Sequence, residues 1–481
     1  MIVQDAKDVV LGFWNGKRLN LEAVDDRLTS DGGLIAFGQL DQTLGWTNSF
    51  CRLVQDSRSN PAHSLLSMVR QRVFGIIAGY EDQNDHDALR SDPMFKLLAD
   101  REPAIEPDLA SQPTLSRMEN SITASDLLRL EDWFIDRFVE SFLEEPSEIV
   151  LDIDTFDDQT HGAQQLTFFH NFYEQFQYQI RVVTCANNDM TVLPVLLHGT
   201  ASATLGAEDD LVRVIGKIRE RFPCTRIHVR GDAAYGSDRI FDSLESLSGV
   251  TYSIGYKCIG DLQRESSDLF NEMKVAFEST RKPQIACLAV DSYKPKKWDV
   301  QRVAIVKCEV NDVSSARRAI ITNRPGARTC PEGAYFEYAD RGESENRHKE
   351  LKCELRIDRL SDHRYMANLF RVMLHTLAAN LLVAMRRVVA DPPNEVATDT
   401  IAFDAGPELQ KRQIANRRRR ADPLGEGHAC TWRTLVIKVA ARIQVTTRRV
   451  RVIISSHWPN HGYLQKVLQE LQQATVASNT G

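Results

Sequence analysis

Apolar side chains recur every three or four residues through much of the first 145 positions of the chain. This is the spacing of helices that bury one face. The clearest run spans residues 61–80, and after a polar turn at residues 111–121 a second long run covers residues 124–145. The pattern predicts a helical N-terminal domain over residues 1–145.

From residue 146 the pattern changes to short apolar runs with the length of strands. In chain order we expect strand, strand, strand, helix, strand, helix and strand, over residues 147–156, 178–187, 190–200, 209–222, 226–232, 237–247 and 250–257. This order predicts a mixed α/β sheet that opens with an antiparallel meander. It is the order of a ribonuclease H-like core.

Residues 259–336 lose the helical spacing and contain strand-like runs, which predicts a β-rich insertion. The insertion would divide the core into a first part, residues 146–258, and a second, mainly helical part, residues 337–390. Residues 391–430 combine turn formers with a basic cluster and predict an exposed basic linker. The C-terminal segment, residues 431–481, alternates like one or two strands and then ends in a short helix.

Composition places the chain among ordinary globular proteins, with 42% hydrophobic and 26% charged residues in a length of 481. That length predicts about two to four structural units. The longest apolar run is interrupted by Arg386 and Arg387 before it reaches the roughly 20 residues of a membrane span. The N-terminus lacks the pattern of a secretory signal, and the nine cysteines include no C-x-x-C pair. We therefore expect a cytoplasmic protein without a membrane helix, a disulfide scaffold or a thiolate metal site.

The net charge of −7 hides a polarity along the chain. Residues 341–460 carry about +9, whereas residues 1–340 carry about −16. The densest basic cluster ends in Arg417, Arg418, Arg419 and Arg420. Such a run is often only a solvated loop, but a basic region on an acidic protein also suggests that a polyanion binds there.

Three aspartates lie where predicted strands end. The pleat of a strand over residues 147–156 puts Asp152 and Asp154 on one face, and Asp232 follows Gly231 at the end of another strand. Ligands and catalytic groups in α/β proteins collect outside such strand ends. The alternative is that each aspartate simply caps the turn or helix that follows it.

The segment YADRGESENRHKELK, residues 338–352, is rich in charge. At about 100° per residue, a helix would align Tyr338, Arg341, Glu345 and Lys352 in one stripe. One interpretation is an exposed helix in which Arg341 and Glu345 form an i,i+4 ion pair. The other is a site for a phosphodiester, where the carboxylate holds a metal ion while the cations and the phenol contact phosphate oxygens.

If Glu345 meets the two strand-end aspartates, three carboxylates supply the oxygen ligands that Mg²⁺ or Mn²⁺ prefers. Two such ions, about 4 Å apart, can activate a water or a 3′-hydroxyl and stabilise the leaving oxygen.

These residues resemble those of bacterial insertion-sequence transposases of the DDE type. The spacing of Tyr338, Arg341, Glu345 and Lys352 matches, without a gap, the signature Y-x-x-R-x-x-x-E-x-x-x-x-x-x-K of one branch of that family. Further similar stretches, LDIDTFDDQTHGAQQ, RGDAAYG and ANLFRVMLHTLAANLL, resemble the insertion-sequence thirteen-eighty group. The resemblance covers residues 25 to 475.

The resemblance implies an enzyme that cuts DNA at the ends of a mobile element and joins the 3′-hydroxyls to a target, with two Mg²⁺ ions, or Mn²⁺, as cofactor. It implies the metal ligands Asp154, Asp232 and Glu345. Asp152 is the second choice for the first ligand, because Asp152 and Asp154 point the same way and both lie in family-like positions. The family places a Thr two residues after the catalytic Asp, whereas here Thr155 follows Asp154 directly and Phe156 occupies the expected place.

The resemblance also implies how double-stranded DNA is bound. Tyr338, Arg341 and Lys352 would hold phosphates near the cut, and Trp298, in the insertion, would stack on a flipped base. The N-terminal helices would bind the element ends, and the basic C-terminal third, with Arg417–Arg420, would bind the target. Two ends require two active sites, which implies a homodimer on paired DNA, associated with the nucleoid in the cytoplasm.

Two alternatives remain at the level of sequence. A transposase-derived protein that binds its own terminal repeats without cutting them would act as a repressor. A nuclease that cuts but never joins strands would use the same metal site.

Overall fold

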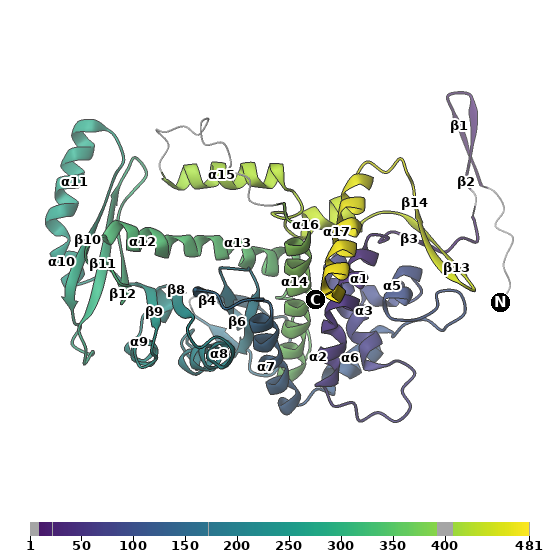
Figure 1. The fold of residues 1–481 in the computed structure, drawn as a ribbon, viewed down its shortest axis with the longest axis horizontal. Coiled ribbons are helices and arrows are strands. Elements are labelled where there is room, and N and C mark those ends of the chain that lie inside the picture. The colour runs from purple at the N-terminus through teal and green to yellow at the C-terminus, as the bar shows by residue number, and fades with distance from the viewer. Residues whose placement is uncertain (1–8, 22, 172, 392–406, 481) are drawn as a thin grey trace.

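A mixed sheet lies at the centre of this computed structural model, which describes residues 9–21, 23–171, 173–391 and 407–480 (Figure 1). Within the described residues the sheet has nine strands in the order β10-β11-β12-β9-β8-β4-β6-β5, with β7 also paired to β6. The pairs β4–β8 and β8–β9 are parallel and the other pairs are antiparallel. The strands are β4 (Glu148–Gln159), β5 (Phe168–His170), β6 (Gln175–Cys185), β7 (Thr191–Leu197), β8 (Arg226–Gly231), β9 (Val250–Tyr256), β10 (Gln284–Tyr293), β11 (Arg302–Val310) and β12 (Ser315–Thr322).

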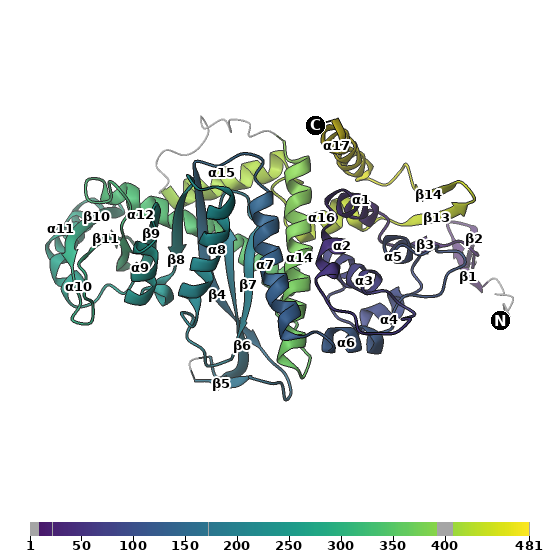
Figure 2. The same cartoon turned by 60° about the horizontal axis from the view of Figure 1, so that its bottom comes forward.

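The central part of the sheet has the predicted order of elements. Along the chain, β4, β6, β7, α8 (Ala207–Arg221), β8, α9 (Asp238–Glu245) and β9 follow one another, and the short strand β5 is the only addition among the described residues. Strands β6 and β8 are buried almost throughout, because helices cover the sheet; Figure 2 shows α7 and α8 lying over it. The protein is therefore a mixed α/β protein with a large mixed sheet.

The insertion extends this sheet. Strand β12 pairs with β9, from Ala319 opposite Tyr256 to Thr322 opposite Ser253, so β10, β11 and β12 continue the sheet at its edge. The predicted strands are present, but the insertion also contains α10 (Asp261–Glu265) and the longer helix α11 (Ser267–Thr280), which the sequence pattern missed. Only Phe270 and Met273 of α11 are buried, so its apolar face is too narrow to give a clear helical period.

The N-terminal region is helical, as predicted, and α3 and α7 occupy the two amphipathic runs. Helix α7 begins with a capping box, in which Thr123 and Asp126 satisfy each other's backbone N–H groups. A hairpin of β1 (Val9–Trp14) and β2 (Lys17–Leu21) precedes the helices and was not predicted. The helices are α1 (Leu34–Leu44), α2 (Trp46–Arg52), α3 (Leu65–Ala78), α4 (Asp85–Leu89), α5 (Pro93–Leu98), α6 (Gln112–Asn120) and α7 (Ala124–Glu140).

The C-terminal segment folds together with the N-terminal helices and not as a separate unit. Strand β13 pairs with β14 on one side and with β3 on the other, and α17 packs on α1 and α14. The backbone N–H of Gly33 donates to Ile437, and a Cβ on Gly33 would lie 1.8 Å from the carbonyl oxygen of Val436, so only glycine fits there. The elements are β3 (Leu28–Thr29), α16 (Ala429–Trp432), β13 (Ala441–Thr446), β14 (Arg449–Ile454) and α17 (His461–Thr480), with a π-helical turn at Arg433–Ile437.

Helix α14 (Tyr365–Val389) connects the two halves of the molecule. It packs on α3, on β7 and on α17, and stands between the sheet and the N-terminal helices in Figure 1. Among the described residues it is the one helix long and apolar enough to cross a membrane, but 83% of its apolar window is buried inside the protein. Helix α14 is apolar because it is buried at the centre of the protein core.

The predicted basic linker is only partly described. Residues 392–406 lie outside the described residues. Residues Pro407–Ala421 form a helix, α15, so the basic cluster is helical and not a loop.

Candidate active site

Asp154 and Asp232 lie side by side where the parallel pairing of β4 with β8 ends. Asp232 follows the last residue of β8, as predicted, but β4 continues to Gln159, so the predicted strand end at Asp154 is wrong. Ile153 of β4 pairs with Gly231 of β8, and the two aspartates follow directly after this pair. Asp232 also accepts a hydrogen bond from the backbone N–H of Ala234 at 2.9 Å and caps a short 3₁₀ turn. The sequence presented capping and a position at the strand end as alternatives. Asp232 has both: it follows the last residue of β8 and it caps the turn.

The segment that carries Glu345 is not one regular helix. It runs through α12 (Pro331–Ala339), a 3₁₀ turn (Asp340–Glu343), α13 (Ser344–Lys349) and a π-helical turn (Glu350–Glu354). Each change of helix type changes the angle between successive side chains. The prediction of a single straight stripe is therefore wrong, although its first three residues come together.

Arg341 brings the three predicted metal ligands to one place. One terminal nitrogen of its guanidinium lies 3.1 Å from an oxygen of Asp154, and the other lies 3.7 Å from an oxygen of Glu345. Asp232 is close enough for its charge to act on the pKa of Arg341. Asp154 and Glu345, which are 191 positions apart in the sequence, thus share one cation.

The two aspartates have pKa values shifted in opposite directions. Burial opposes the charge of Asp154, but the hydrogen bond from His348 and the charges of His348 and Arg341 lower the pKa of its carboxyl overall. Burial, followed by the negative charge of Asp154, raises the pKa of Asp232. Adjacent acids with divergent pKa values are typical of a catalytic or metal-binding pair.

The donor set fits a divalent metal ion. Asp154 and Asp232 repel each other, and a hard cation between them would relieve that repulsion through oxygen ligands. The three acids do not all lie within 4.8 Å of one another, so at least one side chain has to move to ligate an ion together with the other two.

Tyr338 lies at the same place as Arg341. Its ring packs edge-on against Tyr335 at 5.7 Å, and burial raises the pKa of its hydroxyl. A Cβ on Gly255 would lie 2.8 Å from that hydroxyl and 2.7 Å from the backbone nitrogen of Ala233. Gly255 therefore allows β9 to approach both Tyr338 and the turn after Asp232, a role that the sequence analysis missed.

His348 is a further side chain at the site that the sequence analysis missed. Its Nδ1 lies 3.2 Å from an oxygen of Asp154, and its buried Nε2 has no hydrogen-bond partner among the described residues. The signal was present in the sequence, because His348 follows Glu345 by three residues and so faces the same way on α13.

Asp152 has a different environment from Asp154. Its buried carboxylate accepts two hydrogen bonds from Arg230, at 2.7 and 2.8 Å. Both oxygens are therefore engaged by one guanidinium, which makes Asp152 a structural residue and favours Asp154 as the first ligand.

Lys352 does not lie beside Arg341. Its Nζ donates to the backbone oxygen of Asp157 at 2.8 Å and lies 3.1 Å from the carboxylate of that residue. It also lies 5.9 Å from the ring centre of Phe156. Lys352 comes eleven residues after Arg341, so it lies further along the segment and contacts Asp157 and not Asp154.

Trp298 is part of the core of the insertion. Its indole is 5% exposed and packs edge-on against Phe241, Tyr256 and Tyr293, with Arg302 at 5.0 Å from the ring centre. A base could stack on it only after this cluster opened, so the structure gives the predicted stacking role no support.

The four predicted DNA-binding arginines, Arg417–Arg420, lie at the C-terminal end of α15. Arg418 and Arg420 are exposed, whereas Arg419 lies 3.2 Å from Nε2 of His428. Figure 1 shows α15 running alongside α12 and α13 on the upper side of the molecule. The exposed arginines are thus available for a polyanion, as predicted, although they lie on a helix.

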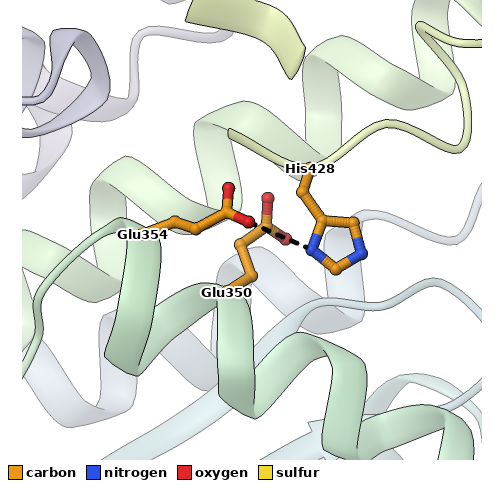
Figure 3. Close-up of side chains that lie close together, drawn as sticks. All are labelled: Glu350, Glu354 and His428. Atoms are coloured by element: carbon orange, nitrogen blue, oxygen red, sulfur yellow. Dashed lines mark ion pairs between the residues drawn. The ribbon is translucent and has the colours of Figure 1, made fainter. Parts of the chain in front are cut away.

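A second group of potential ligands consists of Glu350, Glu354 and His428, whose ligand atoms lie within 4.8 Å of one another (Figure 3). Glu350 accepts hydrogen bonds from Arg386 and from the backbone N–H of Ala429. Burial opposes the charge of Glu354, but hydrogen bonds from His428 and the backbone of Cys430 lower its pKa to about 2. Protein donors thus engage both acids, and the cluster attaches the π-helical turn to the C-terminal segment.

Two hollows flank the end of β4 beyond Asp154. The first, the catalytic hollow, has a volume of about 320 Å³ and extends from Asp232 and Tyr235 to His170 and Tyr173. The second, the cationic hollow, has a volume of about 310 Å³ and is lined by the cations Arg72, Lys352, Arg356, Arg359 and Arg371, among acidic and amide side chains. Asp157 lines both hollows.

Comparison with known proteins gives a family match. Residues 12–403 match the family described as Transposase DDE domain group 1. No curated protein matches the chain. A solved structure, the cryo-EM structure of piggyBac transposase synaptic complex with hairpin DNA, is similar over 82% of each chain, with 10% sequence identity and a TM-score of 0.38. The family rests on the sequence match, because a structural likeness of that size is too low to compare sites.

Proposed function

The chain belongs to the family Transposase DDE domain group 1, and on this premise we propose that it cuts DNA at the terminal inverted repeats of an insertion sequence and joins the 3′-hydroxyl ends to target DNA. The observation that carries the proposal is the meeting of Asp154, Asp232 and Glu345 around Arg341. The proposal includes membership of the insertion-sequence thirteen-eighty group, which the spacing from Tyr338 to Lys352 supports.

The fold supports the same proposal. The central strands lie in the order β7-β6-β4-β8-β9, with an antiparallel meander followed by two parallel strands. We assign this part of the sheet to a ribonuclease H-like core, with Asp154 and Asp232 just beyond the parallel pairing of its strands β4 and β8.

In the proposed reaction Asp154, Asp232 and Glu345 hold two Mg²⁺ or Mn²⁺ ions. When bound, these ions activate a water or a 3′-hydroxyl and stabilise the leaving oxygen. Arg341 and the hydroxyl of Tyr338 donate to phosphate oxygens, which orients the scissile bond. His348 holds the carboxylate of Asp154 in place through its Nδ1.

The wider assembly follows from the substrate. Two element ends require two active sites, so we propose a homodimer on paired double-stranded DNA in the cytoplasm, associated with the nucleoid. The N-terminal helices bind the element ends, and the basic C-terminal third, including α15, binds target DNA through its phosphates.

The test uses the purified chain, Mg²⁺ and a duplex that carries the inverted repeats flanking the gene. We expect cuts at the repeat ends and, with a target plasmid, joined products. Asp154→Asn, Asp232→Asn and Glu345→Gln should each lower cutting by more than about 100-fold, because each removes a metal ligand. Asp312→Asn, in an exposed turn, is the matched control and should cut like the wild type.

Other outcomes separate the alternatives. An Asp232→Asn variant that cuts like the wild type refutes the site. Binding of the repeats by the wild type without cutting identifies a silent DNA-binding protein, and cut but never joined products identify a nuclease.

A further inference from the structure

A short hairpin next to the candidate active site exposes an unusual number of large apolar side chains. The aromatic hairpin comprises residues 166–176, of which Phe172 lies outside the described residues, and β5 pairs in it with the start of β6. Its exposed side chains are between 44% and 56% accessible: Leu166, Phe168, Phe169, Tyr173 and Phe176. An exposed apolar group of this density is typical of a surface that binds something.

The rings of the aromatic hairpin are held in defined positions. Phe169 and Phe176 face each other across the two strands, with ring centres 5.5 Å apart. His170 lies 4.9 Å from Tyr173, and Phe168 lies 5.7 Å from His198 at the end of β7. Because the strand pairing fixes Phe169 opposite Phe176, these two rings are prearranged and lose little entropy when a flat ligand binds.

The aromatic hairpin adjoins the place where the phosphodiester would react. His170 and Tyr173 line the catalytic hollow together with Asp232. Bases next to a scissile phosphate at Asp232 can therefore reach the hairpin through this hollow. Figure 2 shows β5 at the lower end of the sheet, beside β6.

The cationic hollow adjoins the same hairpin, because Gln175, at the start of β6, lines it. Arg72 and Arg371 are paired there with Glu119, and Lys352 with Asp157. The exposed Arg356 and Arg359 are the cations that can contact a sugar–phosphate backbone. Stacking rings next to a cationic groove are the combination by which proteins bind single-stranded nucleic acid. Double-stranded DNA does not offer the faces of its bases in this way, because they are already stacked.

We propose that the aromatic hairpin binds the unpaired bases of the DNA strand next to the cut, with the cationic hollow holding the phosphates of that strand. This inference rests on the proposed function, since it places the scissile phosphate at Asp154 and Asp232. It identifies single-stranded DNA at a cut or opened end as a ligand of the site, in addition to duplex.

The experiment compares two probes: a blunt duplex of about 20 base pairs, and the same duplex with a single-stranded tail of about five nucleotides that contains 2-aminopurine. The full-length wild type should bind the tailed probe about 10-fold or more tightly than the blunt one and should quench the 2-aminopurine, because each stacked base contributes to binding. The double variant Phe169→Ala/Phe176→Ala should lose this preference and the quenching, and should bind the blunt probe unchanged.

Two further variants control the result. Tyr463→Ala removes an exposed ring of α17, far from the site, and should keep the tail preference. Phe169→Tyr/Phe176→Tyr keeps both rings on the hairpin and should also keep it. Thermal unfolding monitored by circular dichroism checks that each variant is folded.

The outcomes are separable. If the alanine double variant keeps the tail preference, the inference is overturned. The inference is also overturned if that variant loses only self-association in sedimentation, which would make the hairpin a contact between two copies of the chain. A wild type that cuts the element ends but shows no tail preference overturns the inference alone, whereas a wild type that neither binds nor cuts those ends overturns the proposed function.

Discussion

At the scale of residues, two aspartates on one face of β4 have different roles because their partners differ. Asp152 is buried against Arg230, which engages both of its oxygens. Asp154, two residues further, meets Arg341 and His348 just beyond the last residue of β4 that pairs with β8. The alternation of a strand predicts that the two share a face, but only the residues packed on that face decide which one is available to a substrate.

The pair of variants Asp152→Asn and Asp154→Asn tests this division. Asp152→Asn leaves the buried Arg230 without a counter-charge and should lower the free energy of unfolding by about 3–5 kcal/mol. Asp154→Asn relieves repulsion with Asp232 and should leave stability nearly unchanged while it abolishes DNA cutting. Urea unfolding and a cleavage assay measure the two effects. A stable, inactive Asp152→Asn together with an active Asp154→Asn would reverse the assignment.

Asp158 gives a second residue-scale prediction, on pH. Neither of its carboxyl oxygens has a hydrogen-bond partner among the described residues. Burial, followed by the charge of Asp358, raises its pKa from 3.8 to about 9, against the opposing charge of Lys352. Between these two pH values the folded protein keeps a proton that the unfolded chain releases, so this group stabilises the fold fully below pH 3.8 and loses that effect as pH rises towards 9.

Asp158→Asn should therefore remove a loss of stability that grows as pH rises. The difference in free energy of unfolding between the variant and the wild type should increase in favour of the variant from about pH 5 to about pH 9, by up to about 1.4 kcal/mol per pH unit. Denaturant unfolding at several pH values measures it, with Asp312→Asn in an exposed turn as the control. Parallel stability curves for wild type and variant would contradict the prediction.

At the scale of elements, the chain from Pro331 to Glu354 shows how helix type positions side chains. A uniform helix would put Lys352 on the face of Arg341 but about 16 Å further along the axis, because a helix rises about 1.5 Å per residue. Lys352 accordingly contacts Asp157, further along β4 than Asp154, and the 3₁₀ and π-helical turns alter the angles between the side chains in between. Arg341 and Glu345 pair directly, because they are four residues apart.

Helix α16 and the turn after it attach the C-terminal segment to α1. Trp432 is fully buried, with its ring edge-on to Phe37 at 5.7 Å and its indole N–H donating to Leu424. Trp432→Ala should lower the free energy of unfolding by about 3–5 kcal/mol, because it opens a large cavity between these elements. Denaturant unfolding measures this, and Tyr463→Ala, on the exposed side of α17, should have little effect. A small loss in Trp432→Ala would show that the C-terminal segment folds without α1.

At the scale of the whole molecule, the insertion, the central sheet and the N-terminal helices, joined by the C-terminal segment, lie along one long axis, with α14 between the halves (Figure 1). The basic part of the chain supplies α13, α15 and four of the five cations that line the cationic hollow: Lys352, Arg356, Arg359 and Arg371. Exposed cations of α15 would attract a polyanion to that helix.

The arginines of α15 test this attraction. Arg418→Ala/Arg420→Ala removes two exposed cations and should weaken binding of any duplex, whatever its sequence. The slope of log affinity against log salt should fall in magnitude by up to about 0.9 for each lost phosphate contact. Arg264→Ala, an exposed arginine of α10 in the insertion, is the control. An unchanged salt slope in the α15 variant would place the DNA elsewhere.

The sequence by itself determined the order of the main elements of the central sheet, the position of Asp232 at the end of a strand and the pairing of Arg341 with Glu345. These depend on spacing within a few residues, which the chemistry of the chain fixes locally. Only the tertiary structure decided which of Asp152 and Asp154 meets Arg341. It also decided the contacts of His348 and Lys352, the burial of Trp298, and the packing of Gly33 against the C-terminal segment. Each of these depends on a partner that is distant in sequence or on the burial of an entire element, and no local spacing specifies such a partner.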